Sequence, residues 1–306
     1  IGTNTNLLLN LQTIIEEIGS KCDNKIWLTC TAQQTLEDLV GGTQNGNEDF
    51  GKILGRFETR ISLESQNTTY ITQKRLLDKN SDGMKVLSDF YKKNKEEIEN
   101  QFIFDHDRYR SFENRDEFVL SYPFIPYQFK LISDVFENFA NLGYVIKEVK
   151  DNERSILGIT HFTSKLYKDV EVGTFVTFDS FFNDQLKSNI THHANKILEP
   201  ALSIDEIQKN KFAQKVVYTL FMISNITDTK KLTFPPNIDN LILLLLDNPD
   251  VNRLDLQNKI QKVLDLLVEK TVIYKEDERY NFYKEDEIDV AKQINNTTIT
   301  VDDRLT

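Results

Sequence analysis

The C-terminal third of this 306-residue chain carries the pattern that most limits how it can fold: apolar helical segments followed by two short alternating segments. The helical segments are residues 212–223, 238–246 and 254–268, and the alternating segments are residues 271–274 and 280–283. The alternating pair flanks a charged turn, which predicts a β-hairpin. Three helices followed by a hairpin is the order of a winged-helix domain, which we expect over residues 204–294.

The first 64 residues follow a different pattern. Apolar residues recur at helical spacing over residues 6–18, and residues 25–31 are typical of a short buried strand. Residues 59–63 alternate in polarity and predict a second strand. A helix followed by a buried strand favours a parallel α/β layer, which we assign to residues 1–64.

The middle of the chain, residues 65–203, is predicted to be helical. Residues 69–98 indicate a pair of helices, and a further helix is expected at residues 156–166. The sequence YPFIPY at residues 122–127 predicts a rigid elbow in which Pro126 begins a helix, because proline suits a first helical position. The tail, residues 295–306, has no apolar face, so we expect it to fray.

Charge and hydropathy exclude several classes of function. The formal net charge of −11 opposes non-specific binding to nucleic acid, so DNA is a possible partner that the charge does not support. No apolar run reaches the ~20 residues that a membrane span needs, which predicts a soluble protein with no membrane partner. The cysteines, Cys22 and Cys30, lack metal-site spacing and fit a reduced cytoplasmic setting. Because the chain starts at Ile1 without a signal-peptide pattern, we expect a fragment of a longer protein.

Five segments, in order, carry a resemblance to a known family. They are LLLNLQTIIEEIG, GKILGRFETRISL, QKRLLDKN, SYPFIPYQFKLISDVF and NERSIL. Together they resemble the large P-loop ATPase of the BREX phage-exclusion systems, most strongly over residues 6–182. Beyond residue 182 the likeness is one of architecture only.

The resemblance implies a mainly α chain that begins with part of an AAA+ α/β core, continues with a helical lid and ends with the winged-helix-like domain. The phosphate-binding pattern G-x-x-x-x-G-K-[ST] does not occur in this sequence, so the chain alone is expected to be inactive. ATP and magnesium would be bound by the longer parent and not by this fragment. The expected partners are further copies of the parent and other phage-defence proteins.

Two arginines are candidates for an arginine finger. Arg56 and Arg60 flank a predicted helix-to-strand junction, and a guanidinium there could stabilise charge on the phosphoryl group bound by a neighbouring subunit. The alternative is a pair of surface salt bridges. The resemblance favours the finger but does not rank the two arginines.

Two further positions are candidates for sensing nucleotide. Thr31 is favoured over Thr29 and Gln33 as a sensor at the end of the predicted strand, although all three could simply cap the loop. Arg154 starts a predicted helix, where it resembles a second sensor arginine facing phosphate as a lid closes. Its alternative role is an ion pair with an acid such as Glu153.

The remaining polar and aromatic features favour structural roles. The four histidines are scattered, so we expect no metal site. The aromatic residues around the elbow are expected to pack a domain junction rather than to stack on bases. Basic and acidic residues nearly balance on residues 254–270 and in the hairpin, which favours protein docking over DNA reading. A non-enzymatic winged-helix adaptor is therefore the alternative to an ATPase fragment.

Overall fold

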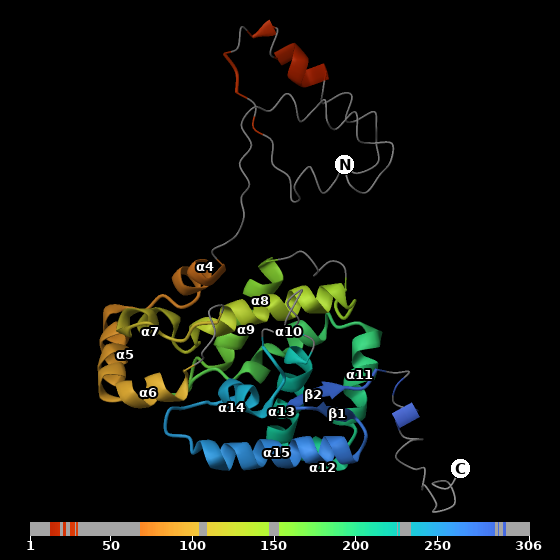
Figure 1. Ribbon diagram of the computed structural model, residues 1–306. Helices are drawn as coiled ribbons and strands as arrows, with labels where there is room; N and C mark the ends of the chain where they lie inside the picture. The colour runs from red at the N-terminus through yellow and green to blue at the C-terminus, as the bar shows by residue number, and fades with distance from the viewer. Residues whose placement is uncertain are drawn as a thin grey trace, which may run out of the picture. The chain divides into compact units, whose positions relative to one another are not determined.

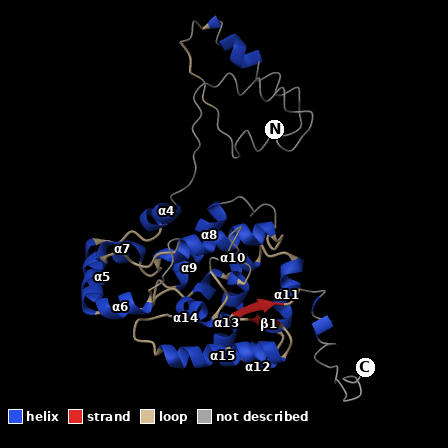
Figure 2. Ribbon diagram, in the orientation of Figure 1, coloured by secondary structure: helices blue, strands red, loops and turns tan. Residues whose placement is uncertain are grey.

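The protein is described from a computed structural model. The structure describes residues 13–18, 21–22, 25–27, 29, 68–103, 109–146, 153–224, 226, 234–284, 287 and 290–291. This part is mainly helical, as predicted, and its one sheet has two strands (Figure 2). The chain divides into two compact units, Ile1–Gln66 and Asn67–Thr306. The domain boundaries expected from the sequence stay predictions.

The first half of the second unit is built from helices. They are α4 (Thr68–Arg75), α5 (Ser81–Lys93), α6 (Lys95–Gln101), α7 (Arg115–Ser121), α8 (Pro126–Asn141) and α9 (Glu153–Leu166). The helix pair expected over residues 69–98 is therefore wrong in number, because the chain breaks twice there. Asn80 ends the first break by capping α5, accepting a hydrogen bond from the Gly83 amide at 2.8 Å. Pro126 begins α8, as predicted.

Short elements connect this half to the C-terminal end. They are the 3₁₀ helix η2 (Phe178–Phe181) and the helices α10 (Asp184–Lys187), α11 (His192–Leu202) and α12 (Asp205–Gln208). The last elements are α13 (Lys211–Ile223), α14 (Ile238–Leu245), α15 (Arg253–Glu269), β1 (Ile273–Glu276) and β2 (Arg279–Phe282). We call residues 205–282 the helix–hairpin module. Figure 1 shows α15 running along one side of this module, and α13, α14 and β1 all pack against it.

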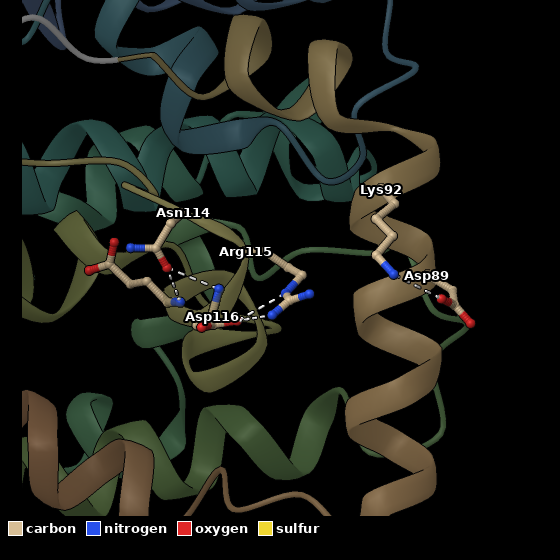
Figure 3. Close-up of polar contacts among 6 residues, drawn as sticks. Asp89, Lys92, Asn114, Arg115 and Asp116 are labelled. Carbon is tan, nitrogen blue, oxygen red and sulfur yellow. Dashed lines mark hydrogen bonds and ion pairs between the residues drawn. The ribbon is translucent and has the colours of Figure 1, made fainter.

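Asparagine side chains begin six of the helices named above, one of which is α5. Asn114 caps α7 by accepting hydrogen bonds from the amides of Asp116 and Glu117, each at 3.0 Å (Figure 3). The same kind of cap is made by Asn183, Asn210, Asn237 and Asn252. An oxygen at this position satisfies amides that have no partner inside the helix, which is why the helices begin where they do.

The order of elements in the module agrees with the sequence, and the strand bounds do not. The residue pairs of the antiparallel ladder run from Ile273–Phe282 to Glu276–Arg279, so Asp277 and Glu278 alone form the turn. A five-residue turn had been expected because those residues are charged. The turn is tighter because Asp277 takes a left-handed conformation, with φ of 55°, which aspartate tolerates better than most residues.

One hydrophobic core runs through the second unit. It includes Ile98 and Phe118 in the first half, Phe175 near η2, and Leu220 and Leu264 in the module, all fully buried. Two backbone hydrogen bonds join distant segments across it: the Phe175 amide donates to the Asp247 carbonyl at 2.6 Å, and the Tyr280 amide to the Pro236 carbonyl at 2.9 Å. The helices and the hairpin therefore share one packed interior.

Less of the first unit is described. Residues 13–18 are helical, in agreement with the sequence, and the rest of that predicted helix lies outside the described residues. The described positions of the strand expected at residues 25–31 belong to no strand, and Trp27 is 97% exposed. A strand needs a neighbour to satisfy its backbone. The strand expected beside it, residues 59–63, is not in the part that the structure describes.

Candidate functional site

The predicted site residues of the first unit cannot be located. Arg56, Arg60, Thr31 and Gln33 lie outside the described residues, and Thr29 is described only as exposed and outside any strand. Arg154 lies in the first turn of α9, which begins three residues before the predicted helix of residues 156–166, and its side chain is outside the description. The roles given to these residues therefore stay predictions.

The helix that carries Arg154 is anchored at its other end. Thr163, on the buried face of α9, donates to the carbonyl of Ile159 at 2.9 Å and shares its proton with the carbonyl of Ser180 at 3.2 Å. The amide of the Asn183 side chain donates to Thr163 Oγ1 at 3.0 Å and to the Ser180 carbonyl at 3.2 Å. These bonds link α9 to η2 and to the start of α10.

Hydroxyl groups extend this contact by one turn. The Tyr167 hydroxyl lies 3.0 Å from Ser180 Oγ and 3.3 Å from Thr177 Oγ1, and it accepts a hydrogen bond from the Thr177 amide at 3.2 Å. We call Thr163, Tyr167, Thr177, Ser180 and Asn183 the buried polar network. Because buried polar groups are costly unless they are paired, the network fixes one arrangement of α9 against η2.

Asp179 is the one carboxyl group beside this network with an unsatisfied atom. Its Oδ1 is buried and has no hydrogen-bond partner among the described residues. Burial raises the pKa of Asp179, the charge of Lys215 on α13 and a hydrogen bond from Thr177 lower it, and Asp247 raises it further. The raised pKa reflects the cost of holding an ionised carboxylate away from water.

The elbow packs as the sequence predicted. Phe124, Tyr127 and Phe129 are almost completely buried. The Tyr122 hydroxyl accepts a hydrogen bond from the Gly173 amide at 3.0 Å, and the Gln128 side chain donates to the Val176 carbonyl at 2.7 Å. The aromatic residues therefore tie α8 to the segment before η2 and leave no open ring face for a base.

Some of the charges exposed on α15 and the hairpin are paired. Lys275 lies 3.3 Å from Glu278, and Lys270 lies 3.1 Å from Glu269. Arg253, at the start of α15, donates to the Gln101 carbonyl at 3.0 Å. Among the residues described, Arg253, Lys259 and Lys262 of α15 and Arg279 of β2 have no ion pair. The acids Asp255, Asp265 and Glu276 on the same elements reduce the attraction of these cations for a phosphate backbone.

The described residues contain no catalytic constellation that we can recognise. No group of three or more histidine, cysteine, aspartate or glutamate side chains in that part of the chain could hold a metal ion. His161, His192 and His193 lie on helices, and His106 is outside the description. None of the described helices is long and apolar enough to cross a membrane. This arrangement can couple a movement of α9 to the helix–hairpin module, and it offers surfaces on which a partner can bind.

Sequence reasoning missed the buried polar network. Its residues come from two segments, 163–167 and 177–183, and nothing in their spacing shows that they meet. The available signal was the run of polar residues between phenylalanines in FDSFFND, residues 178–184, since polar residues inside an apolar segment need partners when buried.

No family model matches the sequence, and no solved structure matches this fold.

Proposed function

We propose that this chain is the C-terminal part of an oligomeric AAA+ ATPase of the phage-exclusion type. In this proposal residues 1–64 complete the α/β core, residues 65–203 form the lid, and residues 204–294 form a winged-helix-like domain. The chain alone does not hydrolyse ATP. ATP and magnesium belong to the longer cytoplasmic protein, which works with further copies of itself and with other phage-defence proteins.

The observation that carries the proposal is the connection of α9 to the helix–hairpin module. Arg154 stands at one end of α9, and the buried polar network binds the other end to η2. The 3₁₀ helix in turn packs against α13 and α14 of the module. A helix that follows the nucleotide state would therefore carry the module with it, as a lid must if it is to do mechanical work.

The arginines supply the chemistry in this proposal. Arg56 or Arg60 reaches a phosphoryl group held by a neighbouring subunit, where a planar cation stabilises the charge of the transition state. Arg154 reaches the nucleotide of its own subunit, helped by the positive end of the α9 dipole. Thr31 senses the γ-phosphate through a hydrogen bond.

Turnover and binding in the longer protein test these roles separately. Arg56→Ala with Arg60→Ala should abolish ATP turnover and leave ATP binding intact, since a finger acts in the transition state. Arg154→Ala should uncouple the lid from nucleotide, which limited proteolysis with and without an ATP analogue would detect. The matched control is Arg115→Ala, because Arg115 pairs with its neighbour Asp116 through Nη2 at 2.7 Å (Figure 3).

Two results would contradict the proposal. Normal turnover after loss of both arginines removes the finger assignment. The absence of a phosphate-binding loop and an acidic strand from the coding sequence that precedes Ile1 removes the ATPase itself.

The second candidate is a non-enzymatic winged-helix adaptor that binds protein. The pairing of Lys270 and Lys275 with acids favours it over a DNA reader, because those lysines are not free for phosphate. A start codon directly before Ile1 would favour the adaptor. Cross-linking of a partner protein to residues of α15 would then identify its docking face.

A further inference from the structure

Helices α10 and α13 bring three lysines and an aromatic ring together. On α13, Lys211, Lys215 and Tyr218 are spaced by four and three residues, so they share one face of the helix. Helix α13 contains no aspartate or glutamate. Lys187 of α10 joins this face from a separate segment, because its Nζ lies 4.8 Å from the centre of the Tyr218 ring. We call these four residues the lysine face.

The aromatic residues hold Lys187 in place on this face. Tyr218 is stacked on Phe182, with the ring centres 4.7 Å apart and the planes at 18°. Lys187 Nζ lies 6.0 Å from the Phe182 ring as well. A cation over aromatic rings keeps its charge and its hydrogen-bond donors while losing freedom of movement. The rings of Phe182 and Tyr218 therefore hold the Lys187 ammonium group in place through cation–π contacts.

None of the three lysines has an ion pair within the part of the chain that the structure describes. Burial raises the pKa of Asp179, and the charge of Lys215 lowers it. Asp205, close to the start of α13, is paired with Lys209 at 3.1 Å. Asp184 lies three residues before Lys187 on α10 and reduces the local positive charge. The three lysines therefore have no ion pair among the described residues, and α13 itself carries no acid.

The position of Lys211 adds a second argument for an anionic ligand. It is the first residue of α13, where the helix dipole is positive, so a cation there is unfavourable unless an anion approaches. From Lys211 to Tyr218 the helix rises about 10 Å. Such a row is longer than a single phosphate group. It suits a chain of phosphates better than one phosphorylated side chain, for which an arginine fork would be the usual partner.

We propose that the lysine face binds the phosphate backbone of a nucleic acid. The contact is independent of sequence, because lysines act as point charges on phosphate. The whole chain has a net charge of −11, so the positive lysine face is a local exception. It lies on α10 and α13 and not on α15, the helix that winged-helix domains usually insert into the groove. The inference does not depend on ATPase activity.

The test is a titration of the full 306-residue chain against fluorescently labelled single-stranded and duplex DNA, followed by anisotropy between about 50 and 200 mM salt. Binding should weaken with salt. Lys187→Gln with Lys211→Gln should weaken it further and reduce the salt slope by about two, one for each phosphate contact. The matched control is Lys259→Gln with Lys262→Gln, which removes the same charge from α15. It should leave both affinity and slope unchanged.

Each outcome decides the proposal. Absence of salt-dependent binding to either probe overturns it, and so does a control variant that loses as much affinity as the lysine-face variant. Lys187→Arg with Lys211→Arg keeps the charge and should retain binding, which separates loss of charge from loss of fold. Circular dichroism of each variant confirms that it is folded. A negative result here leaves the proposed ATPase role standing, because that role rests on other residues.

Discussion

The region from α5 to η2 and the helix–hairpin module are packed in different ways. Between α5 and η2 the core is rich in aromatic rings: Phe118 lies within 5.0 to 6.3 Å, centre to centre, of the rings of Phe90, Tyr91, Phe112, Tyr122 and Phe175. The module is packed mainly with leucine, isoleucine and valine on α13, α14, α15 and β1. The first region also buries polar groups, whereas the module keeps most of them at its surface.

The difference teaches where sequence patterns are informative. Aliphatic residues at regular spacing predict the buried face of a helix, and the helices of the module show this spacing. Large rings and paired polar groups meet through long-range contacts that spacing does not encode. If this comparison is right, equivalent substitutions in the two regions should have unequal effects.

The largest effect is expected at the centre of the aromatic cluster. Phe118→Ala should lower the free energy of unfolding by about 4 kcal/mol, because it removes a fully buried ring that contacts five others. Leu264→Ala, equally buried on α15, should cost about 3 kcal/mol. Urea unfolding of both variants measures the difference. Equal losses would show that the ring contacts add nothing to burial.

A buried carboxylate gives the next comparison. Asp134 accepts a hydrogen bond from the Tyr109 hydroxyl at 2.7 Å and pairs with Lys130 at 2.8 Å, and its side chain is only 5% exposed. Asp134→Ala should lower the free energy of unfolding by about 3 kcal/mol, because the buried Tyr109 hydroxyl loses a charged acceptor. Asp205→Ala breaks an exposed pair with Lys209 in the module and should cost less than about 0.5 kcal/mol. Thermal unfolding distinguishes the two, and similar losses would contradict the contrast.

Two helix caps provide a further comparison between the two regions. Asn252 caps α15 by accepting from the amides of Leu254 and Asp255, and Asn252→Ala should cost about 1 kcal/mol. Asn183 caps α10 and also donates into the buried polar network, so Asn183→Ala should cost about 2 kcal/mol. Hydrogen exchange should show the second loss in α9 as well as in α10. Protection of α9 that does not change would argue against the link between α9 and η2.

The smallest effect is a pH dependence. Burial raises the pKa of Asp179 above its ordinary value of 3.8, so its stabilising contribution is complete below that pH and is lost as the pH rises through the folded-state pKa. Asp179→Asn, which stays neutral, should therefore be more stable than the wild type near neutral pH, and the difference should shrink as the pH falls toward about 4. Urea unfolding of both proteins across this pH range measures the difference.

Much of the fold of the second unit could be predicted from local sequence. The starts of α8 and α13 and the order of the last five elements agree with the prediction. The break between α5 and α6 could not be predicted, because the residues around Asn94 keep a helical pattern across it. Nor could the tight hairpin, since charge suggested a loop at Lys275 and Arg279, while the register of the ladder includes both.

The candidate functional residues divide in the same way. Arg154 was expected at a helix start and lies in the first turn of α9, but its partners depend on tertiary structure. The lysine face has no signature in sequence, because Lys187 is 24 positions from Lys211 and only the stacking of Phe182 on Tyr218 brings their elements together. A surface site formed by separate segments cannot be predicted from the sequence, because its residues meet only when the segments pack together.

By itself the sequence determined the mainly helical class, the caps that begin the helices, the three helices and hairpin at the C-terminal end, and the near balance of charge on α15. These properties follow from spacing, from side chains that bond their own backbone and from composition, all of which act within a few residues. Only the tertiary structure decided which polar groups were buried, how α9 was joined to η2 and which lysines were left without acids. Those outcomes depend on contacts between residues far apart in the chain, where packing and desolvation set the energy.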